Sequence, residues 1–181
     1  MASRTFDIIV AASLPHARTK KEAIGVQGRI PWSCPDDLKH FQRISSLTSD
    51  ESKQNALIMG RRTWNSLPMR PLPSRMNVVL SKTVTHVPDA DATFASLDDA
   101  LLALYNAPNI ESIFVIGGGE VYAAALERMD VGMIYKSVMH IRCPSDADAF
   151  FPTLDTSRFQ LLRKTQNPEA SYHLEYWAAQ K

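Results

Sequence analysis

Asp37 is the residue with the clearest chemical potential, because its carboxylate lies in a predicted first helical turn among apolar positions. Pro35 suits the first helical position, where its missing N–H costs nothing. At 100° per residue Asp37 shares a face with Phe41 and Ile44, with Leu38 on its edge. Ionisable groups are rarely buried without a partner or a task. We therefore predict that Asp37 holds a ligand, although a first-turn acid can also simply complement the helix dipole.

The adjacent Asp36 is predicted to have a different role. It lies on a charged face, which we expect to be solvated, with Lys39, His40 and Arg43. An acid at that position complements the positive end of the helix and needs no further role. Helical periodicity therefore predicts that the two neighbouring aspartates lie on different faces of the helix.

Three glycines in a row (Gly117, Gly118 and Gly119) follow an apolar, strand-like segment and precede a helical one. Such an arrangement binds phosphate, because bare backbone approaches the anion while N–H groups and the helix dipole attract it. The sixth position of the run is Tyr122, so the G-x-G-x-x-G fingerprint is absent. Glycine runs also form plain tight turns, and the run alone leaves both interpretations open.

Two other predicted strands end in basic and hydroxyl residues: one in Arg61, Arg62 and Thr63, the other in Ser81 and Lys82. Ligands of open α/β sheets bind beyond the carboxyl ends of the strands. Arginine and hydroxyl groups suit a phosphate dianion, and no acid closes either strand to receive a free ribose hydroxyl. The combination favours a 2′-phosphorylated nucleotide, NADPH, over NADH. Each cation taken singly is equally compatible with solvation or ion pairing.

Strands and helices must alternate to position these groups. Apolar, β-branched runs predict strands at 6–12, 55–59, 76–80, 112–116, 131–139, 159–163 and 172–178, and helical periodicity predicts helices at 35–47, 62–67, 97–105 and 120–128. Alternation of this kind indicates an α/β fold with a largely parallel sheet. The last strands have no helix between them, so we expect an antiparallel hairpin at one edge. Segment 14–29 is a long irregular stretch with a basic patch at 16–21, typical of a functional lid or of disorder.

The bulk composition fits one soluble domain covering 1–181, with 45% hydrophobic and 22% charged residues. The net charge of +1 gives no reason to expect a nucleic-acid or membrane partner. Two cysteines without metal spacing suggest reduced thiols, and five scattered histidines form no ligand pair, so no metal is expected. The first residues lack a signal-peptide h-region, and we expect a cytoplasmic protein.

Seven sequence blocks together resemble dihydrofolate reductase over essentially the whole chain. In family order they are IVAA (9–12), IGxxGxIPW (24–32), PxDLxxF (35–41), MGRxTWxSL (59–67), RPLPxRxN (70–77), IGGGxxY (116–122) and FFP (150–152). The resemblance implies a single domain with a central, mostly parallel, twisted sheet of about eight strands, an antiparallel C-terminal edge hairpin and about four flanking helices. It also implies reduction of 7,8-dihydrofolate to tetrahydrofolate, with hydride passing from nicotinamide C4 of NADPH to pterin C6 and a proton reaching N5. That product supplies one-carbon metabolism and thymidylate synthesis.

The resemblance also assigns roles to residues around the substrate. Asp37 pairs with the pterin N3–H and 2-amino groups, Trp32 orders the water that delivers the N5 proton, and Ser137 supports the carboxylate where the family usually has threonine. Arg75 binds the α-carboxylate of the glutamate tail. The remaining contacts to the substrate are assigned to Ile9, Val10, Leu38, Phe41, Leu67, Leu72 and Ile116.

The cofactor residues follow from the same resemblance. Backbone groups of Ala11 and Ile24 meet the nicotinamide, with Tyr122 beside its ring and the lid glycines Gly25 and Gly28 nearby. Pyrophosphate contacts fall to Arg62, Thr63, Gly117, Gly118 and Gly119 with the following Glu120 and Val121, and 2′-phosphate contacts to Arg61, Ser81 and Lys82. The family has a cis peptide at Gly117–Gly118. Two departures are a longer 13–23 segment and an acid at Glu120, which weakens nucleotide binding unless it points away.

Two other functions compete with this interpretation. Reductase domains of riboflavin synthesis share the fold but lack the helix-borne acid that Asp37 provides here. A non-catalytic binding module is expected to have lost Asp37, Trp32 or a phosphate contact, and all are present. The resemblance further implies antifolate inhibitors as ligands, and a monomer unless the chain is part of a fusion with thymidylate synthase.

Overall fold

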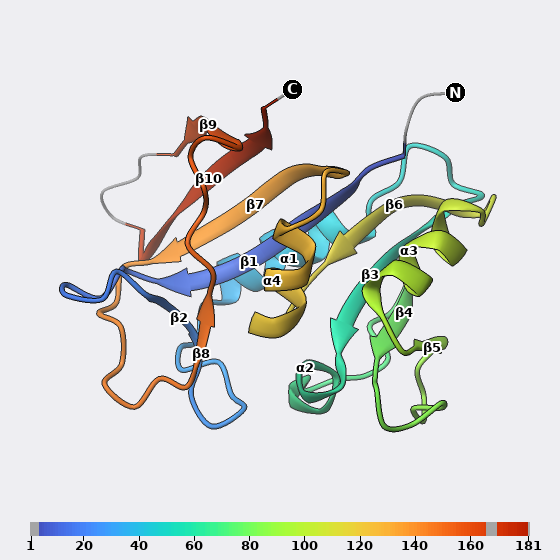
Figure 1. Cartoon of the computed structure of the whole chain (residues 1–181), viewed down its shortest axis with the longest axis horizontal. Coiled ribbons are helices and arrows are strands. Elements are labelled where there is room, and N and C mark those ends of the chain that lie inside the picture. Colours follow the sequence, from blue (N-terminus) through green and yellow to red (C-terminus); the bar gives the residue numbers. More distant parts are fainter. Residues whose placement is uncertain (1–3, 166–169, 181) are drawn as a thin grey trace.

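An eight-stranded sheet forms the centre of the protein, and the computed structural model describes residues 4–165 and 170–180 (Figure 1). The strands are β1 (Phe6–Ser13), β2 (Glu22–Gly25), β3 (Gln54–Gly60), β4 (Arg75–Leu80), β5 (Ala92–Phe94), β6 (Ile110–Val115), β7 (Val131–Met139), β8 (Ala149–Phe151), β9 (Phe159–Lys164) and β10 (Tyr172–Ala179). The helices are α1 (Pro35–Ser46), α2 (Arg61–Ser66), α3 (Leu97–Tyr105) and α4 (Gly119–Leu126). None of these helices is long and apolar enough to cross a membrane.

The strand order is β5-β4-β3-β6-β1-β7-β10-β9, and every pairing from β5 to β7 is parallel. β10 runs antiparallel to both β7 and β9. The fold class is therefore confirmed: a single α/β sheet, mostly parallel, with an antiparallel C-terminal pair at one edge and four helices. Crossover helices explain the parallel part, because two parallel neighbours need a long connection between them.

Three short strands were not predicted, and one of them corrects the expectation for segment 14–29. Glu22–Gly25 forms β2, which pairs antiparallel with β8 in a separate two-stranded sheet. β5 is also only three residues long. Runs of three or four residues carry too little periodicity to reveal a strand, since such strands depend on a partner far away in the sequence.

The helices cover the two faces of the sheet separately. In Figure 1, α3 and α4 lie in front of the sheet and α1 lies behind it. Alternate β1 residues follow this division, because Ile8 and Val10 pack in the core cluster of α3 and α4 whereas Ile9 packs in the cluster of α1 and α2. The α1 face therefore determines which side chains reach the Asp37 region.

The α1 periodicity is confirmed for the aspartates and corrected for one neighbour. Asp36 is exposed and pairs with Lys39 at 3.2 Å, whereas only 9% of Asp37 is exposed. His40, expected on the solvated face, is instead partly buried, and its buried Nε2 atom has no hydrogen-bond partner in the described part of the chain. A residue three positions after a buried one lies at the border of the two faces, so tertiary packing decides its environment.

Candidate active site

The carboxylate of Asp37 lies beside Ser137 of β7, which is itself buried. Burial raises the pKa of Asp37, while a hydrogen bond with the Ser137 hydroxyl and the nearby His40 act to lower it. Ser137 lies directly opposite Ala11 in the parallel β1–β7 pair. The structure thus brings together three predicted site residues from two strands and a helix.

Five of the predicted apolar contacts lie in one cluster on the α1 face of the sheet. Ile9 is buried there, and partly buried side chains pack against the cluster, among them Phe41, Leu67, Leu72 and Ile116. A partly buried wall of this kind is typical of a ligand pocket that still has free apolar surface.

The two remaining apolar predictions behave differently. The Val10 side chain is buried in the cluster on the opposite face, so only its backbone is available to the α1 side. Leu38 is 60% exposed, which means that the protein leaves most of this side chain uncovered. Strand alternation and the helix border explain both outcomes.

Arg75 is a buried cation close to this apolar wall, with only 6% of its surface exposed. Its Nη1 donates to the Ser45 hydroxyl at 2.7 Å, its Nε donates to the Pro73 carbonyl at 2.8 Å, and the guanidinium lies 5.9 Å from the Phe41 ring centre. Burial lowers the pKa of Arg75. No carboxylate in the described part of the chain forms an ion pair with it, so the remaining donors suit an anionic ligand.

Two positioning residues were missed from the sequence. Ser45 is fully buried on α1 and fixes Arg75, as described above. Asn77 braces the preceding loop: its Oδ1 accepts from the Leu72 N–H at 2.9 Å, and its Nδ2 donates to the Leu72 and Arg75 carbonyls. The only signal in the sequence is a polar side chain within an otherwise apolar run, which periodicity treats as a mismatch.

The predicted convergence of three strand ends is present. Gly60 at the end of β3 pairs with Leu80 at the end of β4, and Ile58 pairs with Val115 at the end of β6. The Gly60 N–H also donates to the Gly117 carbonyl at 2.8 Å. The residues that follow these ends therefore lie along one edge: Arg61, Arg62, Thr63, Ser81, Lys82, Gly117, Gly118 and Gly119.

Two helices begin at this edge without side-chain caps. α2 starts after Gly60 and α4 starts after Gly118, and neither N-terminus receives a capping hydrogen bond from a side chain. Arg61 and Arg62, in the first turn of α2, are exposed. Uncapped N–H groups lie beside guanidinium groups that form no ion pair within residues 4–165 and 170–180, and this combination matches what a phosphate needs. The donors present thus fit a phosphorylated nucleotide.

The glycines in this edge are sterically required. Gly117 has a φ of 119°, and the Gly117–Gly118 peptide is cis. A Cβ on Gly119 would lie 2.9 Å from the Phe150 carbonyl oxygen, which is too close for any other residue without a backbone shift. The close packing of neighbouring protein groups therefore requires glycine at these positions.

The three residues that open α4 have separate environments. Tyr122 is buried, its hydroxyl donates to the Ile9 carbonyl at 2.8 Å, and burial raises its pKa. Val121 approaches Gly60, and Glu120 is exposed. Tyr122 thereby ties the glycine turn to the strand that also carries Ile9 and Ala11.

The predicted lid residues belong to the β2–β8 region. Ile24 packs against the core from β2, and Gly25 lies against Ala149 of β8. Gly28 has a positive φ of 75° in the turn that follows, and Trp32 is half-buried. The residues of the lid are therefore anchored at one end to a small sheet.

The comparisons with known proteins agree with this geometry. The family model for dihydrofolate reductase matches residues 11–180. A bifunctional dihydrofolate reductase-thymidylate synthase of Arabidopsis thaliana is 41% identical over 166 residues, which cover 87% of this chain and 30% of that protein. The dihydrofolate reductase of Heliothis virescens is 37% identical over 165 residues, covering 88% of both chains. This chain thus spans about 30% of the length of the bifunctional relatives and most of the length of the insect one.

Proposed function

The chain belongs to the dihydrofolate reductase family, and we propose that it reduces 7,8-dihydrofolate to 5,6,7,8-tetrahydrofolate with NADPH. One observation carries the proposal: the buried Asp37 and the buried Arg75, which has no ion-pair partner among the described residues, flank a single apolar cluster that includes Phe41. A folate has the matching sequence of groups, namely an amino-pyrimidine, an aromatic middle and a glutamate carboxylate.

Asp37 binds and polarises the pterin in this proposal. Its two oxygens accept from the ring N3–H and the 2-amino group, a charge-assisted, bidentate contact that fixes the plane of the ring. The Ser137 hydroxyl supports the carboxylate from the side of the sheet. Burial removes competing water, and the negative charge favours the protonated pterin that accepts hydride more readily.

Arg75 and the apolar cluster bind the remainder of the substrate. The guanidinium forms a fork onto the α-carboxylate of the glutamate tail, because Ser45 and Pro73 use only part of its donor set. Phe41, Leu67 and Leu72 supply apolar surface for the ring between them. Antifolates that share these groups are expected to compete for the same contacts.

NADPH, when bound, supplies the hydride from C4 of its nicotinamide. For this nucleotide we assign the backbone amides of 117–119 and the first turn of α2 to the pyrophosphate, and Arg61, Ser81 and Lys82 to the 2′-phosphate. Tyr122 holds β1 and the glycine turn together, so that the backbone of Ala11 is directed to the same region. Trp32 is assigned to ordering the water through which N5 receives its proton.

The proposal is tested by following NADPH absorbance after mixing the protein with dihydrofolate. We expect loss of the nicotinamide band that requires both compounds and is blocked by a folate analogue. Lys39→Gln, on the exposed side of α1, serves as the control variant and is expected to turn over like the parent. Absence of turnover with NADPH would exclude the activity, and equal turnover with NADH would exclude the 2′-phosphate assignment. A riboflavin-pathway pyrimidine accepted in place of dihydrofolate would support the alternative enzyme class.

A further inference from the structure

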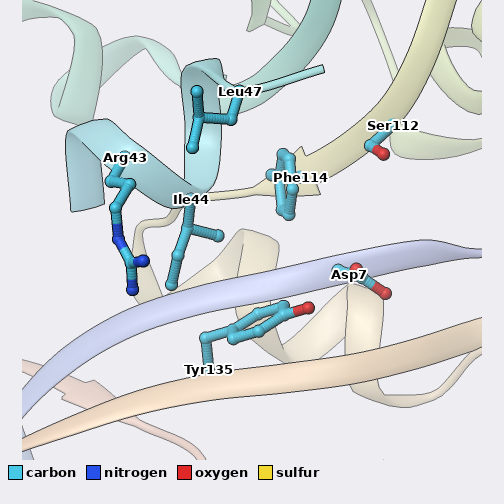
Figure 2. A pocket seen from close by; sticks show the side chains of 7 residues that line it. All are labelled: Asp7, Arg43, Ile44, Leu47, Ser112, Phe114 and Tyr135. Carbon is cyan, nitrogen blue, oxygen red and sulfur yellow. The ribbon is translucent and has the colours of Figure 1, made fainter. Parts of the chain in front are cut away.

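A second pocket, of about 320 Å³, opens beneath the C-terminal half of α1 (Figure 2). Its walls come from α1, β1, β6 and β7, and none of its lining residues is among those assigned above to folate or NADPH. Pockets of this volume are large enough for a small organic molecule. Three features of the lining define what that molecule would be.

The first feature is a negative end formed by Asp7 of β1. Its Oδ1 accepts from the Met133 N–H at 2.8 Å, and across residues 4–165 and 170–180 no cationic side chain forms an ion pair with it. Burial raises the pKa of Asp7, and the hydrogen bond from the Met133 N–H offsets only part of this effect. The Tyr135 hydroxyl is directed towards this carboxylate in Figure 2, so a second polar group points to the same end.

The second feature is a positive group at the opposite end. Arg43 extends from α1 past Ile44, on the far side of the pocket from Asp7 (Figure 2). Arg43 is exposed, and it forms no ion pair in the portion of the chain that is described. The pocket therefore carries opposite charges at its two ends, and neither charged group has an ion-pair partner among the described residues.

The third feature is an apolar middle between the charged ends. Ile44 of α1 and Leu47, the residue that follows this helix, contribute aliphatic groups. The rings of Phe114 and Tyr135 face them from the sheet, with centroids 6.4 Å apart at 63°. Aromatic rings beside a carboxylate also stabilise an organic cation through their electron-rich faces. This composition matches a flat or elongated apolar body and disfavours a compact inorganic ion.

We propose that this pocket binds a small amphoteric molecule, with an amine held by Asp7 and Tyr135, an aromatic or aliphatic body in the middle, and a carboxylate held by Arg43. The ligand is recognised by the separation of its opposite charges across an apolar body. None of its lining residues is assigned to folate or nucleotide, while Ile44, Phe114 and Tyr135 belong to the same apolar cluster as the folate contacts. Its occupancy does not depend on the activity proposed above.

The proposal is tested with three probes that differ only in their charged ends: 4-(aminomethyl)benzoic acid, benzylamine and 4-methylbenzoic acid. Amide shifts in ¹H–¹⁵N spectra of the whole chain locate the binding, with and without NADPH and folate present. We expect shifts at Met133, Ser112 and Ile44, unchanged by NADPH and folate. Because each charge-assisted contact is worth about a factor of ten, the amphoteric probe should bind about tenfold more tightly than either single-charge probe.

Two substitutions assign the ends of the pocket. Asp7→Asn keeps an acceptor for the Met133 N–H and should remove the advantage of 4-(aminomethyl)benzoic acid over 4-methylbenzoic acid. Arg43→Gln should remove the advantage of 4-(aminomethyl)benzoic acid over benzylamine. Lys39→Gln, which removes an exposed cation on the same helix, should change neither of these two affinity ratios. The proposal would be overturned by equal affinities for all three probes, by amide shifts confined to other regions, or by affinity ratios that neither substitution changes. The affinity ratios of the wild-type protein decide the question even if a variant fails to fold.

Discussion

At the scale of single residues, three buried or partly buried charged groups are hydrogen-bonded but lack a Lys, Arg or carboxylate partner within an ion pair among the described residues. Burial raises the pKa of both Asp37 and Asp7, and burial lowers that of Arg75. Each case is unfavourable for the isolated fold, because a desolvated charge costs free energy unless a partner compensates it. Such uncompensated groups are typical of binding sites, where a ligand provides the missing partner.

Asp37→Asn should reduce turnover of dihydrofolate at neutral pH by about 100-fold or more, because a neutral amide neither polarises the pterin nor favours its protonated form. Activity should recover in part at low pH, where the substrate carries its own proton. NADPH affinity should stay the same. Rate–pH profiles together with nucleotide titrations check these outcomes, and a variant that matches the parent at neutral pH would remove Asp37 from the assigned role.

The same substitution should raise the free energy of unfolding at pH 7. Because burial raises the pKa of Asp37 above the ordinary value of 3.8, the folded protein retains a proton that the unfolded chain has released. The free energy of unfolding of the parent therefore falls as the pH increases from about the ordinary value of 3.8 through the raised pKa of Asp37. The Asp37→Asn variant has no carboxyl proton to release at this position, so its free energy of unfolding does not fall for this reason. Urea unfolding should show no difference between the proteins well below pH 3.8 and a more stable variant above the raised pKa. Asp36→Asn, at an exposed position, is the control, and equal gains for both variants would contradict the explanation.

Ser45→Ala should weaken folate binding by about tenfold, because Arg75 loses the hydroxyl that fixes its guanidinium. KM for dihydrofolate should rise while kcat stays close to that of the parent, since the contact lies far from the reacting atoms. Ser46→Ala removes a neighbouring hydroxyl that bonds only to the Gln42 carbonyl, and should leave KM unchanged. Arg75→Leu should show the larger loss, and unchanged folate affinity in Arg75→Leu would remove this residue from the site.

At the scale of elements, the nucleotide edge depends on three parallel strands that end together. β4, β3 and β6 are consecutive in the sheet, and the turn after β6 is tied to β3 through the Gly60–Gly117 hydrogen bond. Two helices start at this edge without side-chain caps, so their free N–H groups point into one region. The anion site proposed for this edge therefore depends on helix positioning more than on any single side chain.

Gly119→Ala tests this positioning. The added methyl group would lie 2.9 Å from the Phe150 carbonyl oxygen, so α4 must shift. Overpacking of this kind costs about 1–3 kcal/mol, and NADPH affinity should fall by at least about tenfold as the amides move. Ala124→Gly, at an exposed position of the same helix, should lower stability by about 1 kcal/mol without affecting NADPH. Equal NADPH affinity in the two variants, measured by fluorescence titration alongside thermal unfolding, would show that α4 does not position the nucleotide.

At the scale of the whole molecule, a buried ion pair joins the small β2–β8 sheet to the large one. Lys136 of β7 donates to both carboxylate oxygens of Glu22 in β2 at 2.7 and 2.8 Å, and its side chain is only 7% exposed. Glu175 of β10 lies 3.8 Å from the same ammonium group. The segment that contains the lid residues is thus anchored to the sheet by charge as well as by backbone pairing.

Lys136→Met should destabilise the protein by about 3 kcal/mol, since it leaves Glu22 partly buried without its partner. The double variant with Glu22→Gln should recover part of the loss, because the unpaired charge is gone. Urea unfolding measures both, and limited proteolysis within 14–29 should be faster in the single variant. Lys164→Met, whose side chain is 45% exposed, is the control. If Lys136→Met were as stable as this control, the Lys136–Glu22 ion pair would contribute little to the free energy of unfolding.

Much of this protein is determined by local sequence pattern. Apolar runs located the long strands, helical periodicity distinguished Asp37 from Asp36, and the order of strands and helices indicated a mostly parallel sheet. These features are predictable because they depend on residues close together in the chain. The three strand ends were also predictable as a group, since parallel strands end at the same edge.

Only the tertiary structure decided the features that depend on distant partners. The β2–β8 pairing, the burial of His40 and the attachment of Arg75 to Ser45 all depend on the packing of separate segments against one another. The two charged groups of the second pocket, Asp7 and Arg43, likewise line one pocket only because α1 packs across the sheet. Periodicity assigns a side chain to a face, whereas packing determines what lies opposite it.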